Sequence, residues 1–342
     1  MAEHRSDQRS DTKISNLLNV KNLTACINKD RKIFKILDDI SFTIDEGEIL
    51  GLAGESGCGK SMTALSIPNL LPQNIKITGG DIIYKNNSLN NMSEKELCNF
   101  RGGEISMIFQ DVRQSLNPMM KVGKQITESL ELYQRLNKRS IDKNENKAAA
   151  IETLKELGFN NPQRIYNAYP HQLSGGMCQR VMTAIAVIRR PKLLLADEPS
   201  SSLDEESQKK CLSLLLDMNH KNKMSLLVIS HDLSIIRQFC SRFLIMYAGK
   251  IVEEGPAESL FSPFHPYTRA LINAIPNREK RGKELENIPG RVPSVENRIN
   301  GCPFAPRCTK AKDICKESFP PAKEIEKSRV YCYFPQTGGT NE

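Results

Sequence analysis

The segment Gly54–Ser61 reads GESGCGKS, and its match to G-x-x-x-x-G-K-S constrains the fold more than any other part of the sequence. It follows an apolar run, Ile49–Ala53, with the length of a buried strand, and Ser61–Ile67 after it is compatible with a helix. A Gly/Ser-rich turn that matches by chance is the alternative, but the flanking strand and helix favour a phosphate-binding loop. We therefore expect a nucleoside triphosphate here, with Lys60 at its terminal phosphates and Ser61 on Mg²⁺.

Length and composition limit the class of protein. The 342 residues predict two or three folding units, and Met1–Ser15, polar and charged without periodicity, is interpreted as a disordered tail. No stretch has the form of a signal peptide, and no run approaches the roughly 20 apolar residues that cross a bilayer, so we expect a cytosolic protein. The formal net charge is +8, but basic and acidic residues are interleaved, which favours a solvated surface and no nucleic-acid partner.

The residues between the tail and the phosphate loop have a β pattern. Leu17–Leu23 and Ile40–Ile44 alternate apolar and polar residues like half-buried antiparallel strands. Further on, Ser93 and Glu96 have the spacing of a capping box at the start of a helix over 94–100. We expect a β-rich subdomain in this part of the chain.

Helical periodicity replaces the β pattern between about 116 and 170, with Gly158 placed as a helix stop. A second glycine-rich turn, Leu173–Met177, then leads into a helix over 181–188. These patterns predict a helical insertion that ends at a glycine-rich turn.

Polar side chains follow two apolar strands. The stretch Lys192–Pro199 predicts an apolar strand with two adjacent carboxylates at its C-terminal end, of which Asp197 can hold Mg²⁺ and Glu198 can polarise an attacking water. An ordinary strand-to-turn boundary is the alternative. His231 follows the strand at 225–230, and a lone histidine is more often structural, but at this edge of a parallel sheet it could reach the same phosphates.

The order of these motifs resembles the ATP-binding-cassette family over residues 17–255. The resemblance implies a mixed α/β fold with a P-loop ATPase core, a β-rich subdomain, a helical insertion and a C-terminal extension. It divides the chain into a tail (1–15), a cassette (16–255, with the insertion at about 116–170) and an extension with four clustered cysteines (256–342). The ATP-binding residues it implies are Gly54, Glu55, Ser56, Gly57, Cys58, Gly59, Lys60, Ser61, Gln110, Ser174, Gly175 and Gly176.

The family also implies a role for each motif. Lys60, Glu198 and His231 are the implied catalytic residues, and Ser61, Gln110 and Asp197 are the implied Mg²⁺ ligands. Ser201–Asp204 corresponds to the family's D-loop. Ser174, Gly175 and Gly176 contact the nucleotide of a partner subunit, so that two cassettes enclose two ATP molecules.

Two positions depart from the family pattern. Met177 stands where most cassettes have Gln, and Cys26-Ile27 occupy the place of the aromatic residue that stacks on adenine. Phe34 is the nearest aromatic residue.

The C-terminal part resembles the peptide and nickel importer branch through residues 262–271, which contain His265-Pro266-Tyr267, and through Gly301–Cys308. From the residues alone, His265-Pro266-Tyr267 reads only as a turn that starts a helix. The branch implies an ATPase subunit on the cytoplasmic face of the membrane. Its partners are a second, related cassette, two transmembrane permeases and, indirectly, an extracytoplasmic solute-binding protein.

Four cysteines, Cys302, Cys308, Cys315 and Cys332, lie in a segment punctuated by prolines. A reducing cytosol argues against disulfides, and the spacing lacks the C-x₂₋₄-C pairs of most zinc knuckles. Four-cysteine [4Fe–4S] ligation tolerates wider spacing, and some members of the resembled branch have such a cluster. We expect a [4Fe–4S] cluster, with zinc or unligated thiols as the alternatives.

The expected function is ATP hydrolysis that drives uptake of di- and oligopeptides, with nickel or metallophore uptake as the alternative solute. Cassettes that act on DNA or ribosomes usually have tandem cassettes or a long coiled-coil insertion, which this chain lacks. A purely regulatory cassette without catalysis is disfavoured because Lys60, Asp197 and Glu198 are all present.

Overall fold

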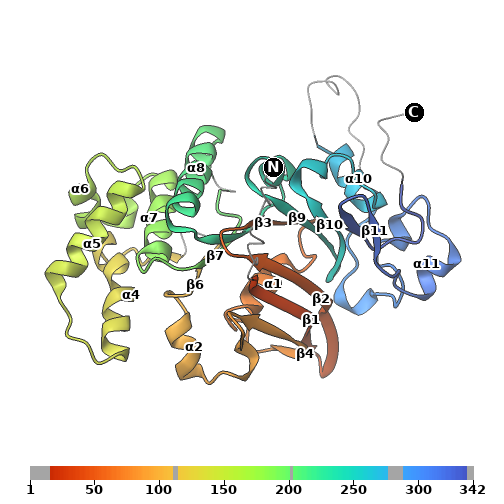
Figure 1. Ribbon diagram of the computed structural model, residues 1–342, viewed down its shortest axis with the longest axis horizontal. Helices are drawn as coiled ribbons and strands as arrows, with labels where there is room; N and C mark the ends of the chain where they lie inside the picture. Colours follow the sequence, from red (N-terminus) through yellow and green to blue (C-terminus); the bar gives the residue numbers. More distant parts are fainter. Residues whose placement is uncertain (1–15, 111–114, 201–202, 276–287, 337–342) are drawn as a thin grey trace, which may run out of the picture.

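The computed structural model describes residues 16–110, 115–200, 203–275 and 288–336, so the tail expected at 1–15 lies outside the described residues. The strands predicted as buried runs form the centre of the molecule (Figure 1). Every residue of β3, β7 and β8 is buried, as in a parallel sheet covered on both faces. These strands pair in parallel with one another and with β6 and β9.

The large sheet has the order β11-β12-β10-β9-β3-β8-β7-β6. Its strands are β3 (Ile49–Ala53), β6 (Ile105–Ile108), β7 (Leu193–Asp197), β8 (Ser225–Ile229), β9 (Arg242–Tyr247), β10 (Lys250–Pro256), β11 (Lys323–Ile325) and β12 (Ser328–Val330). Because β12 pairs with β10, residues of the C-terminal extension continue the sheet of the cassette. Cys302, Phe304 and Cys315 of the extension also belong to the same buried cluster as Tyr247. The extension therefore shares the core of the cassette.

A second, antiparallel sheet has the order β2-β1-β4-β5 and confirms the predicted β-rich region. Its strands are β1 (Asn16–Lys29), β2 (Lys32–Asp45), β4 (Ile75–Tyr84) and β5 (Asn87–Ser88). β1 and β2 are longer than predicted because their pairing shifts register between Val20 and Leu23, which interrupts the alternation of apolar and polar residues.

The described residues form ten α-helices. They are α1 (Lys60–Ser66), α2 (Glu94–Phe100), α4 (Val122–Leu136), α5 (Lys143–Glu156), α6 (Pro162–Asn167), α7 (Gly175–Val187), α8 (Glu205–Asn222), α9 (Leu233–Phe239), α10 (Pro266–Asn273) and α11 (Asp313–Glu317). The capping box at α2 is confirmed, since Ser93 Oγ accepts from the Glu96 N–H and the Glu96 carboxylate accepts from the Ser93 N–H. Within the described ranges, no helix combines the length and apolar character needed to cross a membrane.

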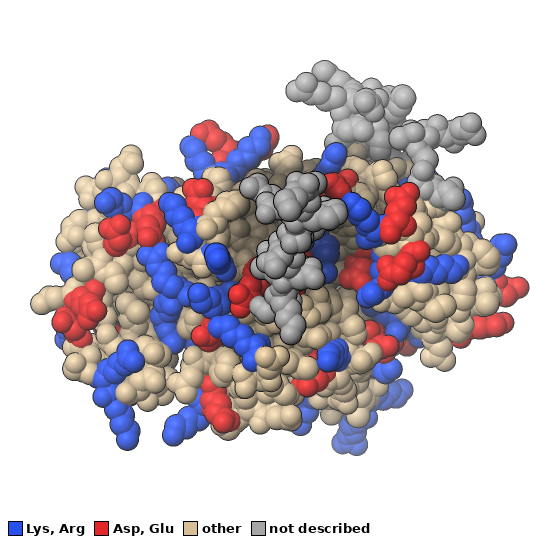
Figure 2. All heavy atoms as spheres, viewed as in Figure 1, with Lys and Arg blue, Asp and Glu red and all other residues tan. Residues whose placement is uncertain are grey.

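The predicted helical insertion consists of α4, α5 and α6, which lie together at one end of the molecule with α7 (Figure 1). α5 ends just before Gly158, whose φ of +74° is a left-handed conformation that favours glycine. On the face shown in Figure 2, Lys and Arg are interspersed with Asp and Glu.

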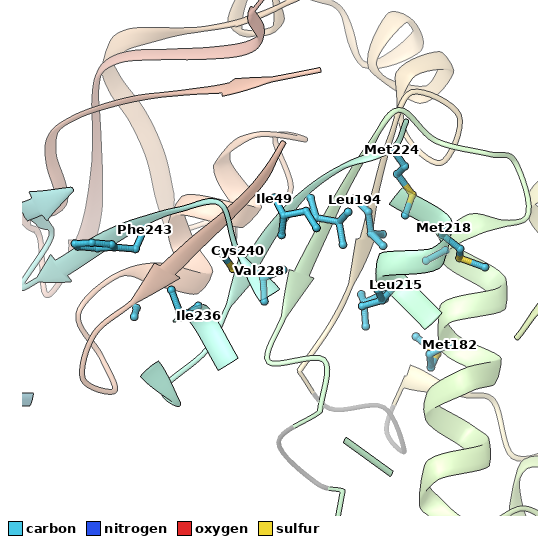
Figure 3. Packing of buried hydrophobic residues seen from close by; sticks show 14 of the residues in the cluster. Ile49, Met182, Leu194, Leu215, Met218, Met224, Val228, Ile236, Cys240 and Phe243 are labelled. Atoms are coloured by element: carbon cyan, nitrogen blue, oxygen red, sulfur yellow. The ribbon is translucent and has the colours of Figure 1, made fainter. Parts of the chain in front are cut away.

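The core beside β7 fixes the strand that delivers the two carboxylates. Leu194 is fully buried and belongs to the same hydrophobic cluster as Ile49 of β3 and as Leu215 and Met218 of α8 (Figure 3). The position of β7 relative to the phosphate-loop strand therefore depends on this packing.

We expect Leu194→Ala to lower the free energy of unfolding by about 2–5 kcal/mol, because it opens a cavity between β7 and α8. Chemical denaturation of the purified chain measures the loss. Leu132→Ala is the matched control, since Leu132 is 56% exposed and its truncation should change stability by less than about 0.5 kcal/mol. Equal effects of the two substitutions would contradict the role of Leu194.

Candidate nucleotide site

The phosphate loop connects β3 to α1, and two of its glycines have conformations that other residues rarely adopt. Gly54 has φ +152°, and a Cβ on it would lie 2.2 Å from the Met246 carbonyl oxygen. Gly59, directly before α1, has φ +114°. The backbone therefore curves at these points in a way that requires glycine.

Lys60 is 6% exposed and extends back into the loop that precedes it. Its Nζ donates to the carbonyl oxygens of Gly54 (2.8 Å) and Glu55 (2.9 Å). Both contacts are to the loop itself, so the conformation of Glu55 and the position of the ammonium group depend on each other.

Asp197 lies at the end of β7 and is 4% exposed. Burial raises the pKa of its carboxyl group, while a hydrogen bond from the Ser61 hydroxyl and the charge of Lys60 oppose this change. Asp197 Oδ1 is buried and has no hydrogen-bond partner among the described residues. A buried carboxylate oxygen left free beside a serine hydroxyl fits a Mg²⁺ site.

Glu198 follows Asp197 and brings the ends of three neighbouring strands together. Gln110, after β6, donates from Nε2 to Glu198 Oε2 (3.1 Å), and His231 Nδ1, after β8, is 3.2 Å from Glu198 Oε1. Glu198 has φ +48°, a strained conformation for a side chain of this kind, which is common at functional sites. The residues Glu198 and His231 line a surface cavity of about 250 Å³.

The second glycine-rich turn lies apart from this group. Ser174 caps α7 by accepting from the Met177 N–H, and Gly175 and Gly176 are the first residues of the helix. A Cβ on Gly176 would face Ser207 of α8. Figure 1 shows α7 among the insertion helices, away from α1. The structure therefore does not bring Ser174–Gly176 to the phosphate loop of the same chain.

The structure also locates Phe34 and the described part of the expected D-loop. Phe34 on β2 pairs directly with Ile27 on β1, so the nearest aromatic residue and the expected adenine position are cross-strand neighbours. Asp204 caps α8, whereas Ser201 and Ser202 of the expected D-loop lie outside the described residues.

Three contacts on the phosphate loop were not predicted from the sequence. Tyr267 Oη accepts a hydrogen bond from the Glu55 N–H (2.8 Å), and Arg307 donates to both carboxylate oxygens of Glu55 (2.6 and 3.0 Å). Arg307 also donates to Tyr247 Oη. His265-Pro266-Tyr267 was interpreted only as a helix start. That interpretation is confirmed, because His265 caps α10 and Pro266 is its first residue, but it missed the contact of Tyr267.

The four C-terminal cysteines line one small cavity of about 20 Å³, and all are free thiols. The pKa of Cys302 is raised to about 12, mainly by burial and to a smaller extent by the charges of Cys332, Cys308 and Cys315. Within the described part of the chain, no three His, Cys, Asp or Glu side chains are arranged to hold a single metal ion.

Comparisons with known proteins agree with this geometry. Residues 37–201 match the family described as ABC transporter, and residues 252–315 match the region described as oligopeptide/dipeptide transporter, C-terminal region. The dipeptide transport ATP-binding protein DppD of Escherichia coli (strain K12) is 39% identical over 321 residues, which cover 93% of this chain and 97% of that protein.

Two further matches concern a relative and a solved structure. The oligopeptide transport ATP-binding protein AppD of Bacillus subtilis (strain 168) is 40% identical over 332 residues, covering 96% of this chain and 100% of that protein. The dimeric structure of the ATP-binding cassette MJ0796 in a post-hydrolysis state with ADP and Pi has a TM-score of 0.63 and 29% identity, and it covers 70% of this chain and 99% of that chain. The chain thus belongs to the ATP-binding-cassette transporter family, in the branch that has the oligopeptide/dipeptide C-terminal region.

Proposed function

We propose that this chain hydrolyses ATP to drive the uptake of di- and oligopeptides through separate permease subunits. The observation that supports it best is the group formed by the phosphate loop, Asp197 and Glu198 at one edge of the parallel sheet. The names of the relatives, a dipeptide and an oligopeptide transport ATP-binding protein, support the solute class. Nickel or metallophore uptake is the alternative solute, and no contact in the described residues favours it.

ATP would bind with its phosphates in the loop Gly54–Ser61. The Lys60 ammonium would exchange its carbonyl partners for the terminal phosphate oxygens, which concentrates positive charge where negative charge develops. The Ser61 hydroxyl, Asp197 Oδ1 and Gln110 would hold Mg²⁺. The bound ion would neutralise charge on the phosphates.

Glu198 would orient the attacking water and accept its proton. Its two carboxylate oxygens are held by Gln110 and His231, so the side chain has a fixed direction before nucleotide binds. His231, 64% exposed at the rim, would reach the terminal phosphate.

A complete site would need a second cassette. Ser174, Gly175 and Gly176 lie far from the loop of their own chain, which supports their contact with nucleotide on a partner subunit. The MJ0796 cassette was solved as a dimer. We infer a heterodimer with a related cassette, on the cytoplasmic face of the membrane beneath two permeases, supplied by an extracytoplasmic solute-binding protein.

The same proposal includes a [4Fe–4S] cluster held by Cys302, Cys308, Cys315 and Cys332. Four thiols that line one cavity supply the four ligands that a [4Fe–4S] cluster takes, whereas a zinc ion needs four ligand atoms about 2.3 Å from one point. When bound, the cluster would replace two buried thiols, Cys302 and Cys315, and two half-buried ones, Cys308 and Cys332, with metal-bound thiolates. The four side chains would thereby be cross-linked within the extension.

For catalysis, we expect Glu198→Gln to retain ATP affinity and to lower kcat by about 10²–10⁴, because the amide keeps the hydrogen bonds but is not a base. The assay is phosphate release and peptide uptake by the reconstituted complex. Glu205→Gln is the matched control, since Glu205 is 80% exposed on α8. Turnover near that of the unmodified protein would remove Glu198 from this role, and intact turnover without peptide uptake would point to another solute.

For binding, Lys60→Ala should weaken ATP affinity roughly tenfold to a hundredfold, because it removes charged hydrogen bonds worth about 1.5–3 kcal/mol. Equilibrium titration with ATP measures the dissociation constant. Lys209→Ala, which removes an exposed lysine from α8, should leave the affinity unchanged. An unchanged affinity in Lys60→Ala as well would mean that the loop is not the phosphate site.

For the cysteines, anaerobically purified protein should be brown and contain iron and acid-labile sulfide in equal amounts. Cys308→Ser should bleach the colour and make residues 288–336 more sensitive to protease, because one ligand and one cross-link are lost. Cys98→Ser, in α2, is the control and should stay brown. Colourless protein with stoichiometric zinc and no sulfide would contradict the cluster.

A further inference from the structure

The C-terminal extension contacts the phosphate loop at one residue, Glu55, from two separate segments. We propose that Tyr267 and Arg307 are positioning residues for the phosphate loop, and that they couple the loop to the cysteine cavity. The proposal rests on the function proposed above, because it assumes that the loop binds ATP.

Tyr267 holds the backbone of the loop. Its side chain is fully buried, and Oη accepts from the Glu55 N–H at 2.8 Å. Its ring packs against Tyr247 of β9 with the ring centres 4.6 Å apart. A rigid aromatic side chain thus fixes one backbone amide of the loop.

Arg307 holds the side chain of the same residue. It is 7% exposed, and its guanidinium binds the Glu55 carboxylate through two N–H groups, a bidentate pair of the strong kind. The remaining N–H groups go to Tyr247 Oη and to the carbonyl oxygens of Ile288 and Pro289. With all its donors used, the guanidinium has a single orientation.

Glu55, which Tyr267 and Arg307 hold in place, in turn contacts Lys60. Its carbonyl oxygen accepts from Lys60 Nζ at 2.9 Å, so its position sets where the ammonium group lies. Because a misplacement of about 1 Å can cost about a hundredfold in rate, two contacts that fix Glu55 matter for nucleotide binding.

Both segments also reach the cysteine cavity. Cys308, next to Arg307, lines it, and so does His265, two residues before Tyr267. His265 Nδ1 accepts from the Tyr267 N–H (3.1 Å), so the ring proton is on Nε2, which is buried and has no partner among the described residues. An N–H donor on the wall of a thiol-lined cavity fits a sulfur acceptor inside it. The ring of Phe304, three residues before Arg307, joins the two segments by packing against Tyr267 and His265.

The test uses Tyr267→Phe and Arg307→Met in the assembled transporter, with steady-state ATPase kinetics. The matched controls are Tyr331→Phe, whose hydroxyl faces Arg329, and Arg329→Met, whose partners are Glu254 and Glu324. We expect both test variants to raise the KM for ATP, by about tenfold for Arg307→Met, with a smaller change in kcat. A role in stability alone would lower the yield and leave KM unchanged.

A double-mutant cycle identifies the partner of Arg307. Glu55→Gln and Arg307→Met should each raise the KM for ATP. The KM of the double variant should not exceed the higher of the two single-variant values, because both substitutions remove the same interaction. Fully additive effects, or an unchanged KM in Arg307→Met and Tyr267→Phe, would overturn the proposal. If Arg307→Met fails to assemble, Tyr267→Phe decides alone, since it removes one oxygen from a ring that keeps its packing.

Hydrogen exchange tests the coupling to the cavity. In the unmodified complex, ATP should slow exchange in residues 302–308 as well as in 54–60, since a coupling between sites acts in both directions. Arg307→Met should abolish the effect at 302–308. Protection confined to 54–60 in the unmodified complex would overturn the coupling. Lys60→Ala separates this inference from the proposed function. If Lys60→Ala weakens ATP binding while Arg307→Met and Tyr267→Phe do not, the loop is still the ATP site and only the inference about Tyr267 and Arg307 is wrong.

Discussion

Parallel pairing of β3, β8, β7 and β6 is the constraint on which the site depends. Parallel strands in one sheet end at the same edge, so residues that follow β6, β7 and β8, far apart in the sequence, lie within hydrogen-bonding distance. Glu198 shows this directly, because its two oxygens contact residues that follow the strands on either side. The buried runs that form the sheet thus have a second effect beyond stability, since they determine which polar residues meet.

Features set by neighbouring residues could be predicted from the sequence. The capping box of Ser93 and Glu96 and the helix stop at Gly158 depend on residues a few positions apart, and both are present in the structure. The strand ends were predictable for the same reason, because each buried run is continuous in the sequence. The bulges between Val20 and Leu23 were not, since a register shift depends on how two strands pair.

The contacts of Tyr267 and Arg307 with Glu55 could not be predicted from the residues near them in the sequence. Tyr267 and Arg307 are 212 and 252 residues away from Glu55, and nothing in their own surroundings points to the phosphate loop. His265-Pro266-Tyr267 predicts a helix start, and Gly301–Cys308 indicates the importer branch and contains two of the four clustered cysteines. The packing of Tyr267 and Phe304 against Tyr247 of β9 holds these segments beside the loop. The extension therefore has to be considered as part of the nucleotide-binding unit.

The sequence separation of Glu55 and Arg307 has a consequence for biosynthesis. Ribosomes add roughly 5–20 residues per second, so the 252 residues between the two partners take about 13–50 s to make. Throughout that interval the nascent chain has its glycine-rich loop and its lysine but not the arginine that holds Glu55. The last segments to leave the ribosome complete one of the first to emerge, and a chain that stops short of residue 307 lacks that contact permanently.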